Sequence, residues 1–146
     1  TDVKSRLLKE FGGWASPIPE IMEATDAEII VERPIWDRQP LSSWSQGRVT
    51  LLGDAAHPMS PSIGQGASTT FEDGYELSEY LLKAPNLKAA LALYDRNRIE
   101  RTQIIQARSA LAAKRAYEPD TEKYPQKTLR SNEEFEDWLY KYDPKI

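Results

Sequence analysis

The stretch GRVTLLGDAAHPMSPSIGQG, residues 47–66, decides how the fold of this 146-residue chain is interpreted. The apolar run at 49–52 predicts a strand, and Asp54 follows it almost at once. A proline-containing loop then leads to Gly64, Gly66 and an amphipathic run. The strand would carry one carboxylate to the edge of a sheet, and the glycines would let a ligand approach the start of the next helix. A hydrogen-bond acceptor beside the free N–H groups of a helix N-terminus suits a polyol attached to an electron-accepting ring.

The same stretch, followed by a helical run that contains Glu72 and Asp73, resembles the C-terminal FAD motif of single-component flavin-dependent monooxygenases. This family, the group A flavoprotein monooxygenases, includes aromatic hydroxylases and zeaxanthin-epoxidase-like enzymes. A Gly-Asp pair alone is more typical of a turn or a cap. Here the surrounding residues also follow the family pattern, from Arg48 through the Gly-Gln-Gly at 64–66.

The resemblance implies a role for each matching residue of the motif. Asp54 would accept a hydrogen bond from a ribityl hydroxyl of FAD, and Pro61 and Ser62 would line one side of the isoalloxazine. The backbone N–H groups facing its pyrimidine edge would come from Gly64, Gly66, Ala67 and Ser68. Reduced flavin carries negative charge at that edge, which the partial positive charge of a helix N-terminus stabilises.

Other polar residues of the motif region have both a functional and a structural interpretation. His57 could be a general base, but we expect a structural histidine whose partners are local backbone groups. Glu72 and Asp73 are expected to interact with the helix dipole and to take part in packing rather than to act as a catalytic pair. We expect Arg98 and Arg101 to form a salt-bridged surface that anchors their helix to neighbouring loops. No side chain is assigned as a nucleophile or as a metal ligand.

A second stretch, Trp36-Asp37-Arg38, resembles the segment that leads from the substrate sheet to the flavin in the same family. We expect Asp37 and Arg38 to form an ion pair at the domain junction. Trp36 is the candidate wall of a substrate pocket.

Composition narrows the classes of function. Cysteine is absent and His57 is the single histidine, which excludes disulfides, thiolate catalysis and histidine-rich metal sites. A net charge of -4 gives no reason to expect nucleic acid or an anionic membrane as partner. No apolar run approaches the ~20 residues of a membrane span, and no signal peptide is visible, so the expected location is cytoplasmic.

The pattern of apolar residues predicts helices and strands in three regions. Helices are expected at 2–11, 18–24, 67–82 and 87–116, and strands at 27–36 and 48–53. Residues 1–47 would end the substrate-domain region, 48–116 would be the C-terminal FAD-binding segment, and 117–146 a polar tail with a possible short helix. The resemblance implies an α/β fold (α+β within this chain), the C-terminal part of an FAD/NAD(P)-binding Rossmann-like flavoprotein.

One half of that flavoprotein fold is missing from this sequence. No set of its seven glycines matches the GxGxxG loop that binds the ADP part of FAD. The stretch from Gly64 to Thr69 begins like this motif but does not directly follow a strand, as the ADP-binding loop must. A sheet strand without neighbours leaves its faces and edges open. We therefore expect a complementary chain or segment with the ADP-binding half, or self-association.

Two functions of different class follow. In the first, the chain is the C-terminal half of a monooxygenase that uses FAD, NAD(P)H and O2 to hydroxylate or epoxidise a small aromatic or alkene substrate through a flavin C4a-hydroperoxide. In the second, it is a truncated relative without bound FAD that acts as a small oligomeric binding or assembly protein. The colour of the purified protein distinguishes the two.

Overall fold

The computed structural model describes residues 2–117 and 132–144, which divide into two units, Thr1–Ile35 and Trp36–Ile146. The first unit contains α1 (Val3–Phe11), α2 (Ile18–Ala24) and the short 3-10 helix η1 (Ala27–Ile29). The Asp2 side chain caps α1 by accepting a hydrogen bond from the backbone N–H of Lys4. The ammonium of Lys4 donates to the carbonyls of Glu23 and Thr25, both at 2.7 Å, and so joins α1 to the end of α2.

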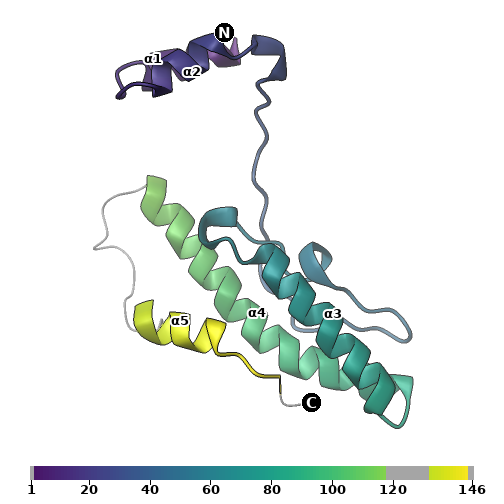
Figure 1. The fold of residues 1–146 in the computed structure, drawn as a ribbon. Coiled ribbons are helices and arrows are strands. Elements are labelled where there is room, and N and C mark those ends of the chain that lie inside the picture. Colours follow the sequence, from purple (N-terminus) through teal and green to yellow (C-terminus); the bar gives the residue numbers. More distant parts are fainter. Residues whose placement is uncertain (1, 118–131, 145–146) are drawn as a thin grey trace. The chain divides into compact units, whose positions relative to one another are not determined.

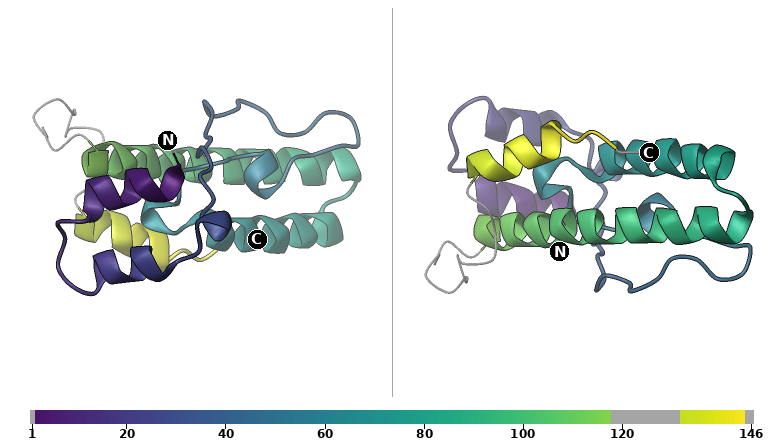
Figure 2. Two further views of the ribbon diagram at one scale, coloured as in Figure 1. Left: turned by 90° about the horizontal axis from the view of Figure 1, so that it is seen from above. Right: turned by 90° about the horizontal axis from the view of Figure 1, so that it is seen from below.

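The second unit is built on two long antiparallel helices, α3 (Gly66–Lys83) and α4 (Leu87–Tyr117), which lie side by side (Figures 1 and 2). Two 3-10 turns, η2 (Gly53–Ala55) and η3 (Pro61–Ile63), precede α3. A third helix, α5 (Asn132–Tyr140), packs against this pair and lies where the sequence suggested a short docking helix. The helices predicted at 2–11, 18–24, 67–82 and 87–116 are therefore confirmed to within a few residues.

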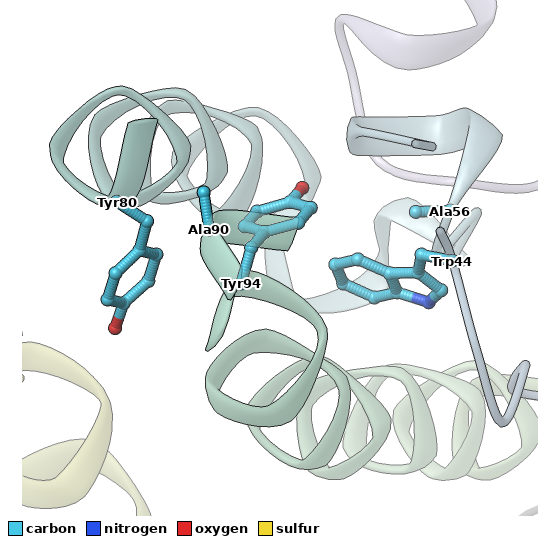
Figure 3. Close-up of a cluster of buried hydrophobic side chains, with 5 residues drawn as sticks. All are labelled: Trp44, Ala56, Tyr80, Ala90 and Tyr94. Atoms are coloured by element: carbon cyan, nitrogen blue, oxygen red, sulfur yellow. The ribbon is translucent and has the colours of Figure 1, made fainter. Parts of the chain in front are cut away.

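The apolar core of the second unit joins both long helices to the segment before η2 (Figure 3). Its buried members are Trp44, Ala56, Tyr80, Ala90 and Tyr94. The hydroxyl of Tyr94 donates to the carbonyl of Leu51 at 3.2 Å. The carboxylate of Asp95 accepts from the backbone N–H groups of Trp44 and Ser45, each at 3.1 Å. These bonds fasten the segment at 44–52, which we call the extended segment, to α4.

The strands predicted at 27–36 and 48–53 do not form in the described part of the chain. Residues 27–29 form the 3-10 helix η1 instead of a strand. Among the described residues, β-type pairing is limited to one isolated antiparallel bridge between Gln46 and Val49. Leu52 keeps an extended backbone, with φ −147° and ψ 148°. The cause is the lack of a neighbouring strand, because strands are stable only when another strand accepts and donates their backbone hydrogen bonds. Among the helices of residues 2–117 and 132–144, none combines the length and apolar composition that a bilayer crossing demands.

Candidate functional site

A hollow of about 530 Å³ opens where the loop after Leu52 meets the N-terminus of α3. Its walls are the extended segment, η2, the loop up to η3, and the first turn of the helix. The lining residues are Leu52, Gly53, Asp54, Met59, Ser60, Pro61, Gly64, Gly66, Ala67 and Thr70.

Most of the residues predicted to contact a flavin meet around this hollow. Asp54, Pro61, Gly64, Gly66 and Ala67 line it. Ser62 and Ser68 are exposed but do not line it. Trp36, the candidate substrate wall, lies apart from the lining with 78% of its surface exposed.

Two glycines give the loop its shape. Gly53 and Gly64 have φ values of +59° and +67°, in the left-handed region that side chains with a Cβ disfavour. A Cβ on Gly53 would also lie 2.9 Å from Oγ1 of Thr70, so the loop approaches α3 closely. Gly64 ends η3 and turns the chain into α3.

The N-terminus of α3 has no side-chain cap. Gln65 occupies the N-cap position without a side-chain hydrogen bond to the helix, and the first turn holds no acidic residue. The first N–H groups of a helix have no partner within it, and the helix dipole places about half a positive charge there. The hollow therefore has an anion-attracting wall at Gly66 and Ala67 and an exposed carboxylate at Asp54.

A buried carboxylate connects this loop to the long helices. Asp73 of α3 is fully buried, and its Oδ2 accepts a hydrogen bond from the backbone N–H of Gly53 at 3.0 Å. The same oxygen lies 2.5 Å from Nε2 of His57, and Oδ1 accepts from Nε of Arg98 at 2.8 Å. Asp73 thus holds the residue next to Asp54 in place.

The arginines of α4 complete a cluster of charges between α3 and α4. Arg98 also bonds Glu72 at 2.8 Å and Glu76 at 3.0 Å, and Arg101 binds both carboxylate oxygens of Glu72 at 2.8 Å. The predicted salt bridges exist, but the expectation of a surface cluster is wrong because Arg98 and Arg101 are 0% and 4% exposed. The expectation that Glu72 and Asp73 interact with the helix dipole is wrong, because α3 begins at Gly66 and both residues lie beyond its first turn. Their packing role is confirmed, and it consists of ion pairs. The apolar spacing of α3 and α4 gave no sign that these charges face inward.

The ionised state of the acids is favoured by this cluster. Burial by itself raises the pKa of Glu72, but the hydrogen bond from Arg101 and the charges of Arg98 and Arg101 outweigh it and lower the pKa below its usual 4.5. For Asp73, burial also raises the pKa, and the hydrogen bond with His57 and the charge of Arg98 bring it below 3.8.

Two further expectations about local partners need correction. The ring of His57 is fully buried and faces the Asp73 side chain rather than local backbone groups. It has no exposed surface through which to act on a ligand, which supports a structural role. Arg38 donates to the carbonyls of Ala55 and Ala56, so it holds the loop after Leu52 instead of pairing with Asp37. Both bonds come from one terminal nitrogen of the guanidinium, Nη2.

Comparison with known proteins gives consistent matches over most of the chain. A family model described as "FAD binding domain" matches residues 22–112. Aurachin C monooxygenase/isomerase from Stigmatella aurantiaca is 46% identical over 100 residues, covering 68% of this chain and 26% of that protein. Chloroplastic zeaxanthin epoxidase from Oryza sativa subsp. japonica is 39% identical over 118 residues, covering 74% and 18%.

A solved structure of a protein with bound FAD is also similar to this chain. Klebsiella pneumoniae HpxO complexed with FAD and uric acid superimposes with a TM-score of 0.76 and 30% identity, covering 81% of this chain and 30% of that chain. The chain therefore spans less than a third of the length of each of these three proteins.

Removing Arg98, which bonds three acidic residues of the cluster, should destabilise the protein strongly. Arg98→Met leaves the carboxylates of Asp73 and Glu76 buried without their cation, so we expect the free energy of unfolding to fall by about 3–5 kcal/mol. Urea denaturation followed by circular dichroism measures it. Arg96→Ala, an exposed position on the same helix, is the matched control and should change stability by less than about 0.5 kcal/mol. A loss below about 1 kcal/mol for Arg98→Met would contradict the role of the cluster.

Stability should also depend on pH in the acid range. The pKa values of Glu72 and Asp73 are lower in the folded than in the unfolded protein. Their contribution to folding stability is therefore fully present above the pKa values of the unfolded state, and it is lost as the pH falls through the pKa values of the folded state. Thermal denaturation should therefore show a falling melting temperature below about pH 4. Glu72→Gln should flatten this dependence, whereas Glu133→Gln, at an exposed position, should not. An identical acid profile for Glu72→Gln and the unsubstituted protein would show that Glu72 is not held ionised.

Proposed function

The chain belongs to the FAD binding domain family, and we propose that it forms the C-terminal half of an FAD-dependent monooxygenase. The observation that carries this proposal is the hollow at the N-terminus of α3, where an exposed carboxylate, a proline-bearing loop and an uncapped helix end meet. The identity of 46% to a monooxygenase over 100 residues supports it.

The residues around the hollow fit a flavin. Asp54 would accept hydrogen bonds from ribityl hydroxyls, because its carboxylate is exposed at the rim. Pro61 would cover one side of the ring system, and the backbone N–H groups of Gly66 and Ala67 would donate to its electron-rich edge. Ser68 contributes through its backbone as part of the same helical turn, and Ser62 lies next to Pro61 in η3.

The proposed reaction uses FAD and NAD(P)H and transfers one oxygen atom to the substrate. Reduced flavin supplies the reactivity with O2; one oxygen atom enters the substrate, the other leaves as water, and NAD(P)H is oxidised to NAD(P)+. The residues of this chain bind and orient the flavin, and the positive end of α3 stabilises negative charge on its pyrimidine edge. The substrate class is a small aromatic or alkene compound, and the exposed Trp36 is available to cover it.

This half of the enzyme needs a companion. The outer face of α3 exposes a stripe of apolar side chains, with Phe71 and Leu82 each 79% and Tyr75 54% exposed. Val49, in the extended segment, is 68% exposed. Burying such surface against other protein is favourable by about 25 cal/mol per Å². We propose that a chain or segment with the ADP-binding half covers it, with self-association as the second possibility.

Asp54 tests the flavin site directly. In the assembled enzyme, Asp54→Ala should weaken FAD binding by about ten- to a hundredfold, because a lost acceptor at a ligand site costs on the order of 1–3 kcal/mol. Flavin fluorescence titration measures the affinity, and absorbance after extensive dialysis measures retention. Glu100→Ala, an exposed acidic residue outside the hollow, should leave both unchanged. Unaltered flavin retention in Asp54→Ala would remove this residue from the site.

The exposed stripe predicts the assembly of the isolated chain. At micromolar concentration we expect native mass spectrometry to find a co-purifying companion or self-associated species, and FAD binding to be weak when the companion is absent. Replacing Phe71 and Leu82 together by serine should shift the population towards monomer because it removes the apolar contact surface. The matched control replaces Glu133 and Asp137, which are exposed on α5, by serine. A compact monomer of the unsubstituted chain without any companion would contradict the proposal.

A further inference from the structure

The C-terminal helix α5 and the residues after it lie outside the 22–112 segment that the family model matches. We propose that this segment, residues 132–144, is a positioning element that holds the Met59–Ile63 loop in the shape needed for flavin binding. This inference rests on the proposed function for the identity of the ligand. Its structural part, the support of the loop by α5, stands on contacts of the chain itself.

The apolar face of α5 packs behind the loop. Phe135 and Leu139 are each 7% exposed and form a buried cluster with Ile105 of α4. Met59 and Ile63 pack against this cluster. Met59 also lines the hollow, so one side chain contacts the flavin site and the support at the same time. Loss of the cluster would therefore free the wall that carries Pro61.

The end of α5 is anchored by Arg101. Its guanidinium donates to the carbonyls of Leu139 at 3.1 Å and Trp138 at 3.5 Å, in the last turn, where helix carbonyls lack partners within the helix. The same group lies 3.7 Å from the ring centroid of Tyr142 and 4.6 Å from that of Trp138. A helix of nine residues is too short to be stable alone in water, so α5 depends on this anchor and on its apolar face.

Tyr142 attaches the segment after α5 to the charge cluster. Its hydroxyl donates to Oε1 of Glu76, the carboxylate that also bonds Arg98. Burial, together with the hydrogen bond to Glu76 and its negative charge, raises the pKa of Tyr142 to about 12. The phenol therefore keeps its proton and remains a donor at neutral pH.

The longer segment at 53–63, of which the loop is the later part, is consequently held at two points that both connect to the charge cluster. Its beginning is fixed by Asp73, which accepts from the N–H of Gly53. Its later part rests on Phe135 and Leu139, and the helix that carries them is fastened through Arg101 to Glu72. Helix α4 also holds this segment directly, because Gln106 donates to the carbonyl of Pro58 at 3.0 Å. The specific contribution of α5 is the apolar contact with Met59 and Ile63.

Hydrogen exchange of the chain without flavin tests the support of the loop. In Leu139→Ala, amide exchange measured by mass spectrometry should rise about tenfold for a peptide spanning 58–65, because local opening becomes easier by about 1.4 kcal/mol. Peptides from the middle of α3 and α4 should keep their protection. Asp137→Ala, an exposed position on the same helix, is the matched control and should leave the loop unchanged. Leu139→Met, which conserves volume, should restore the protection of the loop.

The outcomes separate positioning from general stabilisation. Faster exchange in α5 with an unchanged loop overturns the proposal, and so does an equal increase over the loop, α3 and α4. Tyr142→Phe, which removes only the hydroxyl bond to Glu76 and keeps the apolar cluster, provides a milder second variant if Leu139→Ala does not fold. It should raise exchange in the segment after α5 and, to a smaller degree, in the loop; protection of the loop identical to that of the unsubstituted chain would overturn the coupling.

A flavin titration of the assembled enzyme completes the test. Leu139→Ala should weaken FAD binding about tenfold, and Leu139→Met should restore it. Failure of the proposed function differs from failure of this inference. If the proposed function is wrong, no variant binds flavin, but Leu139→Ala still raises the hydrogen exchange of the loop. Unchanged FAD affinity in Leu139→Ala, with a loosened loop, would show that the loop does not need its support to bind flavin.

Discussion

The structure around the candidate site depends on the buried carboxylate of Asp73. A carboxylate without exposed surface is costly unless its oxygens are matched by donors, and here both oxygens are used. One donor is the N–H of Gly53, which is adjacent to Asp54 in the chain. The position of the predicted ligand-binding carboxylate therefore follows from a helix residue twenty positions further on.

The ion pairs around Asp73 also determine how α3 lies against α4. Arg98 bonds the three acidic residues Glu72, Asp73 and Glu76, which occupy about one turn of α3. Apolar side chains would pack without the cost of desolvating charge, but they would allow the helices to slide or rotate more easily. The directional bonds of one guanidinium favour the register in which Gly53 reaches Asp73.

The sequence predicted the helices and singled out half of the residues that line the hollow, because both depend on local information. Apolar spacing identified α3 and α4, and the motif resemblance identified Asp54, Pro61, Gly64, Gly66 and Ala67, which lie together. Features that depend on residues distant in sequence were missed. The acceptor for Gly53 is Asp73, the carbonyls held by Arg38 are seventeen and eighteen positions away, and the burial of Arg98 and Arg101 requires α5 and α3 to cover them. No periodicity in a single segment carries such information.

The predicted strands do not form for a related reason, which also concerns the candidate site. The residues at 49–52 have the composition of a buried strand, and Leu52 has the extended backbone of one, yet Val49 is 68% exposed. Strand formation is a property of a pair, so composition can specify it only when the partner is present. The loop and α3, in contrast, are fixed by the charge cluster within the unit itself. The described part of the chain thus carries one preformed wall of the hollow, and residues 2–117 and 132–144 contain no strand that could pair with the segment at 49–52.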